Sequence, residues 1–169
     1  FKFMEKKMEK FTVPCVAAII EKITNNEKYI LIQTRQKEDG AETNGMLELP
    51  AGKIREYENI FETLRREVKE ETGLTITKIL GEDRQISNLI GGNEVISYTP
   101  YCITQNLSGA YSIILNTFLC EAEGELLTET NESQNIHWIK FEELKKILKN
   151  NPEKIFLLHI NALQKYLGI

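Results

Sequence analysis

The segment 49–74 constrains the fold more than any other part of the sequence, because a loop runs directly into a helix rich in acidic residues. Residues 49–58 contain Pro50 and Gly52, which are typical of loops. Residues 60–72 contain neither proline nor glycine and consist largely of residues with high helix propensity. The composition therefore predicts a loop followed by a single helix.

The predicted helix has a signal at each end. Asn59 is a suitable N-cap, and Glu62 stands three residues later, where its side chain can complete a capping box. Gly73 stands where a residue in the left-handed conformation commonly ends a helix. These signals predict a helix that begins after Asn59 and ends before Gly73.

The helix also divides into an apolar face and an acidic sector. The residues that share the apolar face are Phe61, Leu64 and Val68. The carboxylates in the adjoining sector are Glu67, Glu70 and Glu71. Like charges at this spacing repel each other, so they favour a bound cation such as Mg²⁺, which prefers oxygen ligands and is often shared with substrate phosphates. The alternative is a solvated acidic surface, which is the usual explanation for a run of glutamates.

The segment resembles the signature of the Nudix hydrolase family. The positions that match the signature are Gly52, Glu58, Arg66, Glu67, Val68, Glu70, Glu71, Gly73 and Leu74. The resemblance implies a metal-dependent enzyme that hydrolyses a diphosphate linked to a nucleoside or a similar group. It also implies Mg²⁺ as cofactor, with Mn²⁺ as a substitute, and an α/β/α sandwich fold.

The resemblance further implies roles for individual residues. The metal ligands are expected to be Glu67, Glu70, Glu71 and the backbone carbonyl of Ala51. Glu67 or Glu70 could instead contact a metal-bound water and take a catalytic role. We expect Arg66 to orient the neighbouring glutamates, because an arginine can hold a carboxylate through two hydrogen bonds. Glu58 is expected to support the loop or a water-bound metal.

Residues outside the helix complete the expected site. Arg35 ends the second predicted strand, where the family often presents an arginine to phosphate, although an exposed arginine at a strand end often only aids solubility. We assign Arg35 and Gly52 to substrate binding. In the family, a further carboxylate from the loop before the final strand often reaches the metals or the attacking water. Glu132 is expected to take this role, because it stands six residues before Trp138, a spacing similar to that in members that use such a glutamate. Glu129 is the alternative. Both glutamates could also be merely solvated.

The two histidines are expected to be structural. His137 alternates along a predicted strand, and His159 lies within an apolar helical segment.

The segment Leu-Glu-Leu-Pro-Ala-Gly before the signature resembles the branch of the family that cleaves ADP-ribose and nucleoside-diphosphate sugars. Nucleoside triphosphates, dinucleotides and coenzyme A remain open as substrates. A non-catalytic domain that senses a nucleotide sugar is the alternative from a different functional class. Its expected mark, the loss of signature carboxylates, is absent from the sequence.

Composition limits the remaining possibilities. A chain of 169 residues with 41% hydrophobic content predicts one domain, 11–169, preceded by a lysine-rich tail, 1–10. The net charge of −4 offers no basic stripe for nucleic acid. The chain has neither an apolar run that could span a membrane nor a signal peptide, so we expect a cytoplasmic protein. The family resemblance implies a small nucleotide as its partner. A homodimer remains open.

The three cysteines are Cys15, Cys102 and Cys120. They are widely spaced among apolar or β-prone neighbours, which predicts reduced, buried thiols rather than disulfides or a zinc site.

Alternating apolar residues and turn residues predict the other elements. The predicted strands are 12–23, 28–36, 46–49, 74–81, 94–105, 110–122 and 136–140, and the predicted terminal helices are 141–148 and 152–167. Segment 124–135 is predicted to be a long acidic loop. Strands on both sides of one long helix, followed by two helices, predict a mixed sheet covered on both faces.

Overall fold

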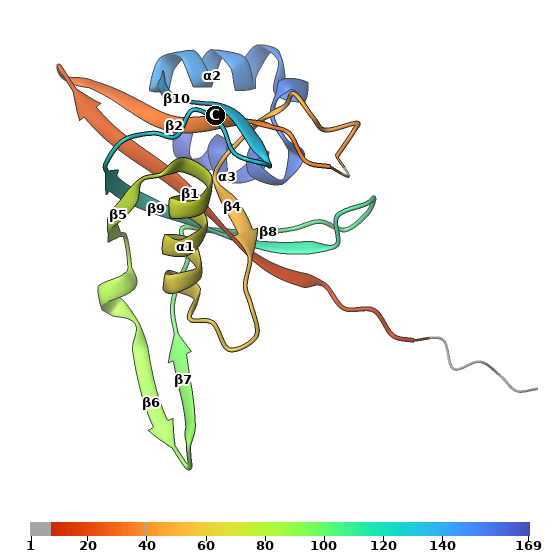
Figure 1. Ribbon diagram of the computed structural model, residues 1–169, viewed down its shortest axis with the longest axis vertical. Helices are drawn as coiled ribbons and strands as arrows, with labels where there is room; N and C mark the ends of the chain where they lie inside the picture. The colour runs from red at the N-terminus through yellow and green to blue at the C-terminus, as the bar shows by residue number, and fades with distance from the viewer. Residues whose placement is uncertain (1–7, 39) are drawn as a thin grey trace, which may run out of the picture.

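The computed structural model describes residues 8–38 and 40–169. Most of the N-terminal tail predicted for residues 1–10 therefore lies outside the described residues. The chain forms a mixed sheet with helices on both faces (Figure 1), which confirms the predicted α/β/α arrangement.

The main sheet is built around β1 (Val13–Thr24). This strand pairs antiparallel with β2 (Glu27–Arg35) and parallel with β9 (Ile113–Glu123). The order across the sheet is β10-β2-β1-β9-β5, with β5 spanning Thr75–Ile79 and β10 spanning Ser133–Lys140. The parallel pairing joins segments about one hundred positions apart, so the centre of the sheet depends on both halves of the chain.

Three short strands extend the main sheet. They are β3 (Leu47–Glu48) beside β2, β4 (Ala51–Lys53) beside β1, and β8 (Cys102–Gln105) beside β9. β4 corrects the expectation that 49–58 is entirely loop, because the backbone of Ala51–Lys53 pairs with Cys15–Ala17 of β1.

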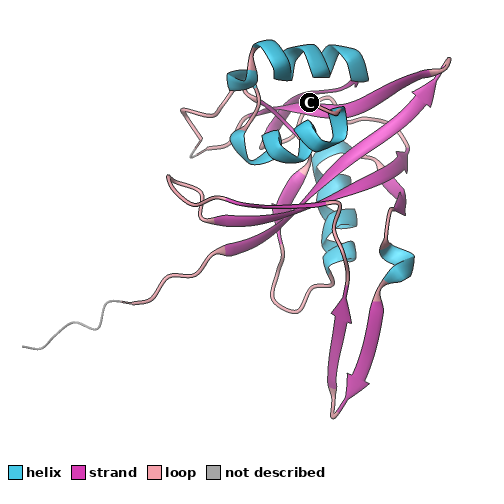
Figure 2. Ribbon diagram, turned by 180° about the vertical axis from the view of Figure 1, so that it is seen from behind, coloured by secondary structure: helices cyan, strands magenta, loops and turns pink. Residues whose placement is uncertain are grey.

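Side chains of β1 alternate between two helical layers. On one face, Val16, Ala18 and Ile20 pack in the cluster that includes α1 (Ile60–Thr72). On the other, Ile19 packs in the cluster that includes α2 (Phe141–Asn150) and α3 (Leu157–Leu167). Both faces of β1 are thus covered, which explains its run of six consecutive buried residues. Figure 2 shows α2 and α3 in front of the sheet and α1 behind it.

The helix α1 begins and ends where the sequence predicts. The Asn59 side chain accepts a hydrogen bond from the Phe61 N–H at 2.9 Å, and Gly73 adopts the left-handed conformation at φ 83°. The predicted capping box is wrong. In the described part of the chain, the Glu62 carboxylate instead accepts a hydrogen bond from Arg65 at 2.8 Å, because the guanidinium one turn along the helix competes for it.

The segment predicted as one strand, 94–105, is two strands in two different sheets. β7 (Asn93–Ser97) pairs with β6 (Ile86–Ile90) in a separate hairpin, whereas β8 joins the main sheet. Pro100 lies between them and cannot donate a backbone hydrogen bond to a ladder. The hairpin projects away from the sheet (Figures 1 and 2).

The last predicted helix, 152–167, is also divided. Residues Pro152–Lys154 form a 3₁₀ turn, and α3 begins only at Leu157. Between them, Ile155 and Phe156 are buried, and the Phe156 N–H donates to the Leu47 carbonyl at 2.9 Å. Burial of these two residues against β3 interrupts the helix.

Two further findings bear on the sequence predictions. All three cysteines are free, and Cys102 is only partly buried. None of the helices within residues 8–38 and 40–169 has the length and apolar character required to cross a membrane.

Candidate active site

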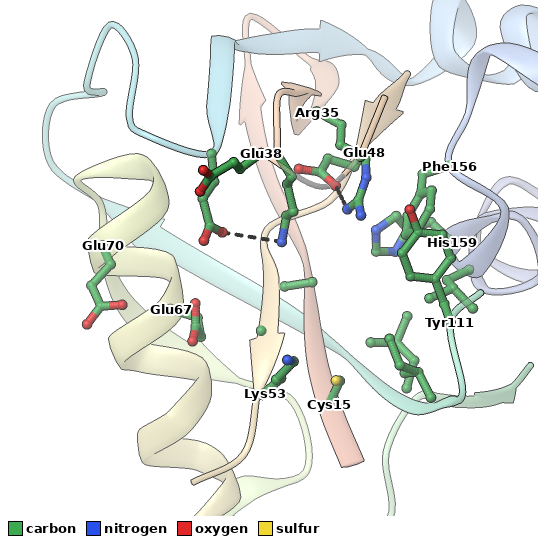
Figure 3. Close-up of a pocket in the computed structure, with 18 of the residues that line it drawn as sticks. Cys15, Arg35, Glu38, Glu48, Lys53, Glu67, Glu70, Tyr111, Phe156 and His159 are labelled. Carbon is green, nitrogen blue, oxygen red and sulfur yellow. Dashed lines mark hydrogen bonds and ion pairs between the residues drawn. The ribbon is translucent and has the colours of Figure 1, made fainter. Parts of the chain in front are cut away.

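A cavity of about 790 Å³ extends from the acidic side of α1 across β4, β1 and β9 to the start of α3. Residues that line it come from both ends of the chain, from Cys15 to His159. Figure 3 shows the acidic helix with Glu67 and Glu70 on one side and the aromatic residues on the other. The volume of the cavity is within the usual range for a small-molecule site.

Arg66 organises the acidic side of the cavity. Its Nε and Nη2 donate to the two Glu58 carboxylate oxygens at 2.8 and 2.9 Å, and its Nη1 donates to Glu67 at 2.7 Å and Glu70 at 3.3 Å. Hydrogen bonds from Arg66 lower the pKa of Glu58 to about 2. Glu58 therefore remains ionised and fixes the guanidinium that orients Glu67 and Glu70.

Glu67 is held close to the loop by Gly52. A Cβ atom added to Gly52 would lie less than 3.0 Å from the Glu67 carboxylate, closer than real Cβ atoms approach. Gly52 therefore admits the carboxylate through its lack of a side chain. Burial raises the pKa of Glu67, the Arg66 hydrogen bond opposes this, and the charges of Glu70 and Glu132 add to the rise.

Glu70 and Glu71 have different surroundings. Glu70 lines the cavity with its side chain 54% exposed, whereas Glu71 is buried and does not line it. The Glu71 carboxylate accepts hydrogen bonds from the Ala51 N–H at 3.0 Å and from Gln33 Nε2 at 3.2 Å. Burial, and then the nearby charge of Glu48, raise the pKa of Glu71 to about 8. Glu71 is thus bound to the loop at Ala51, whereas Glu70 is paired with Arg66.

Arg35 ends β2, as predicted, but its side chain is buried rather than exposed. It is 6% exposed, its Nη1 donates to Glu48 at 3.0 Å, and its Cζ lies 4.0 Å from the centre of the Phe156 ring. Tyr111 lies on the same side, with its ring centre 5.3 Å from Arg35 Cζ. Arg35 lines the cavity between an acidic partner and two aromatic rings, as Figure 3 shows.

Glu132 also lines the cavity, whereas Glu129 does not. The Glu132 carboxylate pairs with Lys37 Nζ at 3.3 Å, and its backbone carbonyl accepts a hydrogen bond from the Gln36 N–H at 2.9 Å. These contacts connect the loop before β10 to the loop after β2. The charge of Glu132 contributes to the raised pKa of Glu67, so the two carboxylates face the same space.

The two histidines differ from each other. His137 Nδ1 lies 2.6 Å from the Asn135 carbonyl, beside the irregularity in β10, which is consistent with the expected structural role. His159 is buried but lines the cavity, so it belongs to the site as well as to the core.

The sequence of the chain matches the model of a known protein family. The model of the NUDIX domain family matches residues 13–159. The chain belongs to the Nudix family. Among curated proteins, no sequence matches the chain.

Several solved structures of other proteins share the fold. The NUDIX domain of Shewanella oneidensis NrtR, in complex with ADP ribose, is 13% identical with a TM-score of 0.65, covering 95% of this chain and 89% of that one. The MutT protein from Methanosarcina mazei Go1 is 20% identical with a TM-score of 0.58, covering 94% and 95%. A C. elegans Ap4A hydrolase, in a binary complex, is 14% identical with a TM-score of 0.54, covering 92% and 96%. At these sequence identities, the similarities show a shared fold.

As a Nudix hydrolase, the protein hydrolyses pyrophosphate bonds, and Nudix hydrolases generally use divalent metal ions. Within the described residues, no group of three acidic, histidine or cysteine side chains is already arranged around one point. The donor set nevertheless suits a hard cation. Burial disfavours the ionised forms of Glu67 and Glu71, and a divalent ion would offset this cost for both. Ala51, in the loop that approaches these carboxylates, also lines the cavity.

Sequence reasoning missed several residues of this Nudix site. The missed residues are Gln33, Lys37, Glu48, Lys53, Tyr111 and Phe156. Lys53 directly follows Gly52 and could have been noticed from its place in the signature loop. Tyr111 and Phe156 carry no such signal, because they meet only when the β8–β9 turn and the start of α3 fold over β1.

Proposed function

We propose that the protein hydrolyses the diphosphate bond of a nucleoside diphosphate derivative, with ADP-ribose or a related nucleotide sugar as substrate and Mg²⁺ as cofactor. The observation that carries this proposal is the distribution of charge around one cavity. The carboxylates that line it are Glu38, Glu48, Glu67, Glu70 and Glu132, and the cations are Arg35, Lys37, Lys53, Arg55 and Arg66. Arg35 is paired with Glu48 and Arg66 with Glu58 and Glu67, so the cations for phosphate are Lys37, Lys53 and Arg55. A diphosphate requires both kinds of charge, because its negative charges must be balanced while a metal-binding carboxylate cluster remains close by.

The proposed roles follow from the positions of the side chains. Glu67, Glu70, Glu71 and the Ala51 carbonyl would hold the metal. When bound, the ion neutralises phosphate oxygens and lowers the pKa of an attacking water. Arg66 keeps Glu67 and Glu70 oriented through its hydrogen bonds. Positioning of this kind accounts for a large part of enzymatic rate enhancement.

Glu132 would accept the proton of the attacking water. It faces the same space as Glu67, and its only described ionic partner is Lys37, which is partly exposed. A substrate phosphate can attract Lys37 and release the Glu132 carboxylate. Glu132 ends the loop before β10, and loops that close over a substrate commonly move during catalysis.

The substrate assignment rests on two observations. The loop Pro50-Ala51-Gly52 resembles that of the nucleotide-sugar branch. The NrtR domain, which shares the fold over 95% of this chain, was solved with ADP ribose. Dinucleotides and nucleoside triphosphates are the competing substrates.

A turnover assay with a panel of nucleotides tests the proposal. ADP-ribose, UDP-glucose, ATP, Ap4A and coenzyme A are each incubated with the protein and Mg²⁺ or Mn²⁺, with a Glu70→Gln variant as control. We expect the highest kcat/KM for ADP-ribose and release of AMP together with ribose 5-phosphate. A higher kcat/KM for ATP than for ADP-ribose would overturn the substrate assignment, and binding of ADP-ribose without turnover would indicate a sensor domain.

A further inference from the structure

The wall of the cavity opposite the acidic helix is aromatic. The rings of Tyr111 and Phe156 meet edge to face with centres 5.3 Å apart, and the rings of Phe156 and His159 meet in the same way at 5.7 Å. The Arg35 guanidinium lies over Phe156 and is paired with Glu48. We call the three residues Tyr111, Phe156 and His159 the aromatic wall.

His159 carries an unpaired polar atom in this wall. The residue is 2% exposed, and its Nδ1 is buried without a hydrogen-bond partner. A buried polar atom without a partner destabilises a fold, so its presence requires an explanation. A leucine on this otherwise apolar side of α3 would avoid the cost.

The position of His159 distinguishes it from the other unpaired atoms. In the described part of the chain, four buried side-chain atoms lack a partner: Gln33 Oε1, Thr117 Oγ1, Ser133 Oγ and His159 Nδ1. Of these four residues, His159 is the one that lines the cavity. A ligand can supply the missing partner if the imidazole turns toward the cavity, because Nδ1 itself has almost no exposed surface.

The charge of the surroundings defines the kind of ligand group. Burial, followed by the charges of Arg35 and Lys37, lowers the pKa of His159 to about 3, so the imidazole is neutral. The nearby guanidinium of Arg35 is already balanced by Glu48 at 3.0 Å. This end of the cavity therefore offers an uncharged hydrogen-bonding atom beside aromatic rings, which suits a flat heterocycle better than a second phosphate.

We propose that His159 is a specificity-determining residue whose Nδ1 forms a hydrogen bond with the edge of the substrate's nucleobase, while the base lies against Tyr111 and Phe156. The phosphates then extend toward Lys53 and the carboxylates of α1. This assignment rests on the proposed function in one respect, namely that the ligand is a nucleotide. It adds that the enzyme discriminates between bases and that one side chain of α3 is responsible.

Binding of nucleoside monophosphates tests the proposal separately from catalysis. Dissociation constants for AMP, GMP, CMP and UMP are measured by calorimetry in the presence of EDTA, so that neither metal nor turnover contributes. We expect the unaltered protein to discriminate between the best and worst base by about 10-fold or more, as is typical when a buried polar atom is left unpaired. His159→Leu should reduce this ratio to about 3-fold or less.

Two variants serve as controls. His159→Asn, which places an amide group close to the position of Nδ1, should retain discrimination. Thr117→Val removes another buried, unpaired polar atom that does not line the cavity, and it should leave the ratio unchanged. In NMR spectra of protein labelled with ¹⁵N-histidine, the Nδ1 resonance of His159 should shift on addition of the preferred monophosphate. The resonances of His137 should not shift.

The outcomes separate this proposal from the proposed function. Equal affinity for all four monophosphates in the unaltered protein, or an unchanged ratio in His159→Leu, would overturn the role of His159. Hydrolysis of ADP-ribose could still be observed in either case. Conversely, base discrimination that disappears in His159→Leu would support the subsite even if no diphosphate in the panel were hydrolysed.

Discussion

The Glu67 carboxylate lies in the space that a side chain on Gly52 would occupy. Gly52 does not have a positive φ, so alanine can adopt its backbone conformation, and the glycine is required only for the close approach. Gly52→Ala should therefore displace the end of the Glu67 side chain and leave the fold intact. We expect kcat to fall by about 10²-fold, because a displacement of about 1 Å can have that effect. The free energy of unfolding should change by less than about 1 kcal/mol.

A double substitution tests whether this loss acts through Glu67. If Gly52→Ala acts by displacing the carboxylate, adding it to Glu67→Gln should cause little further loss of kcat. Additive losses would show that Gly52 acts on the substrate directly.

Glu70→Gln and Glu71→Gln should each remove most of the activity at saturating Mg²⁺, because each removes a metal-binding carboxylate. Without metal, Glu71→Gln should stabilise the protein at pH 8, since it removes a buried carboxyl whose ionisation is unfavourable. Kinetic assays and thermal unfolding in EDTA measure both effects. Glu62→Gln, on the outer side of the same helix, is the matched control and should change neither. Near-normal turnover in both variants would show that the metal site is elsewhere.

Leu64→Ala should destabilise the fold by about 2–5 kcal/mol, because Leu64 is fully buried where α1 packs on the sheet. Urea denaturation measures the loss, and the kcat of the remaining folded protein should be close to normal. An unchanged denaturation midpoint would contradict the observed orientation of α1.

Glu132→Gln should lower kcat by about 10²-fold or more if Glu132 accepts the proton of the attacking water. Glu129→Gln, in the same loop but outside the cavity, should remain active. The pH–rate profiles of the two variants should therefore differ, with the acidic limb lost only in Glu132→Gln. The reverse result would assign the role to Glu129, and two active variants would mean that the loop takes no part in the chemistry.

Stability should decrease as the pH falls below 6.5, in part because of His159. Its pKa is lowered from 6.5 to about 3 in the folded protein, so the unfolded chain binds a proton more readily over this interval. The stability associated with the neutral ring is present above pH 6.5 and is lost as the pH falls toward 3. His159→Leu should make the decrease shallower in denaturation experiments at a series of pH values. An equally steep decrease in the variant would show that the ring is not protonated on unfolding.

The sequence allowed the fold to be predicted wherever local signals act alone. Asn59 and Gly73 define the ends of α1 through their own side chain and backbone, so the limits of the helix could be stated in advance. The predictions were wrong where distant contacts decide the structure. The helix expected from Pro152 is interrupted because Phe156 forms a hydrogen bond with Leu47, more than one hundred positions away.

The candidate site shows the same division. Arg66 and the glutamates of α1 lie within one motif, and their proximity follows from helical geometry. Arg35 lies at a strand end, as expected. Its burial could not be predicted, because it depends on Glu48 and Phe156, which no pattern in the sequence connects to Arg35. For His159, an apolar helical setting suggested a structural role, and only the cavity beside it reveals the unpaired nitrogen.

The parallel pairing of β1 with β9 has a consequence for how the protein acquires its activity. The chain can form the β1–β2 hairpin and α1 early, because their contacts are local, but β9 must close a loop of about one hundred residues before it reaches β1. Residues 156–159 follow β9 in the chain, so they are synthesised after it. During synthesis on the ribosome, the acidic helix α1 therefore emerges well before the aromatic wall that faces it, and the nascent chain at that stage carries the acidic motif without the rest of the cavity lining.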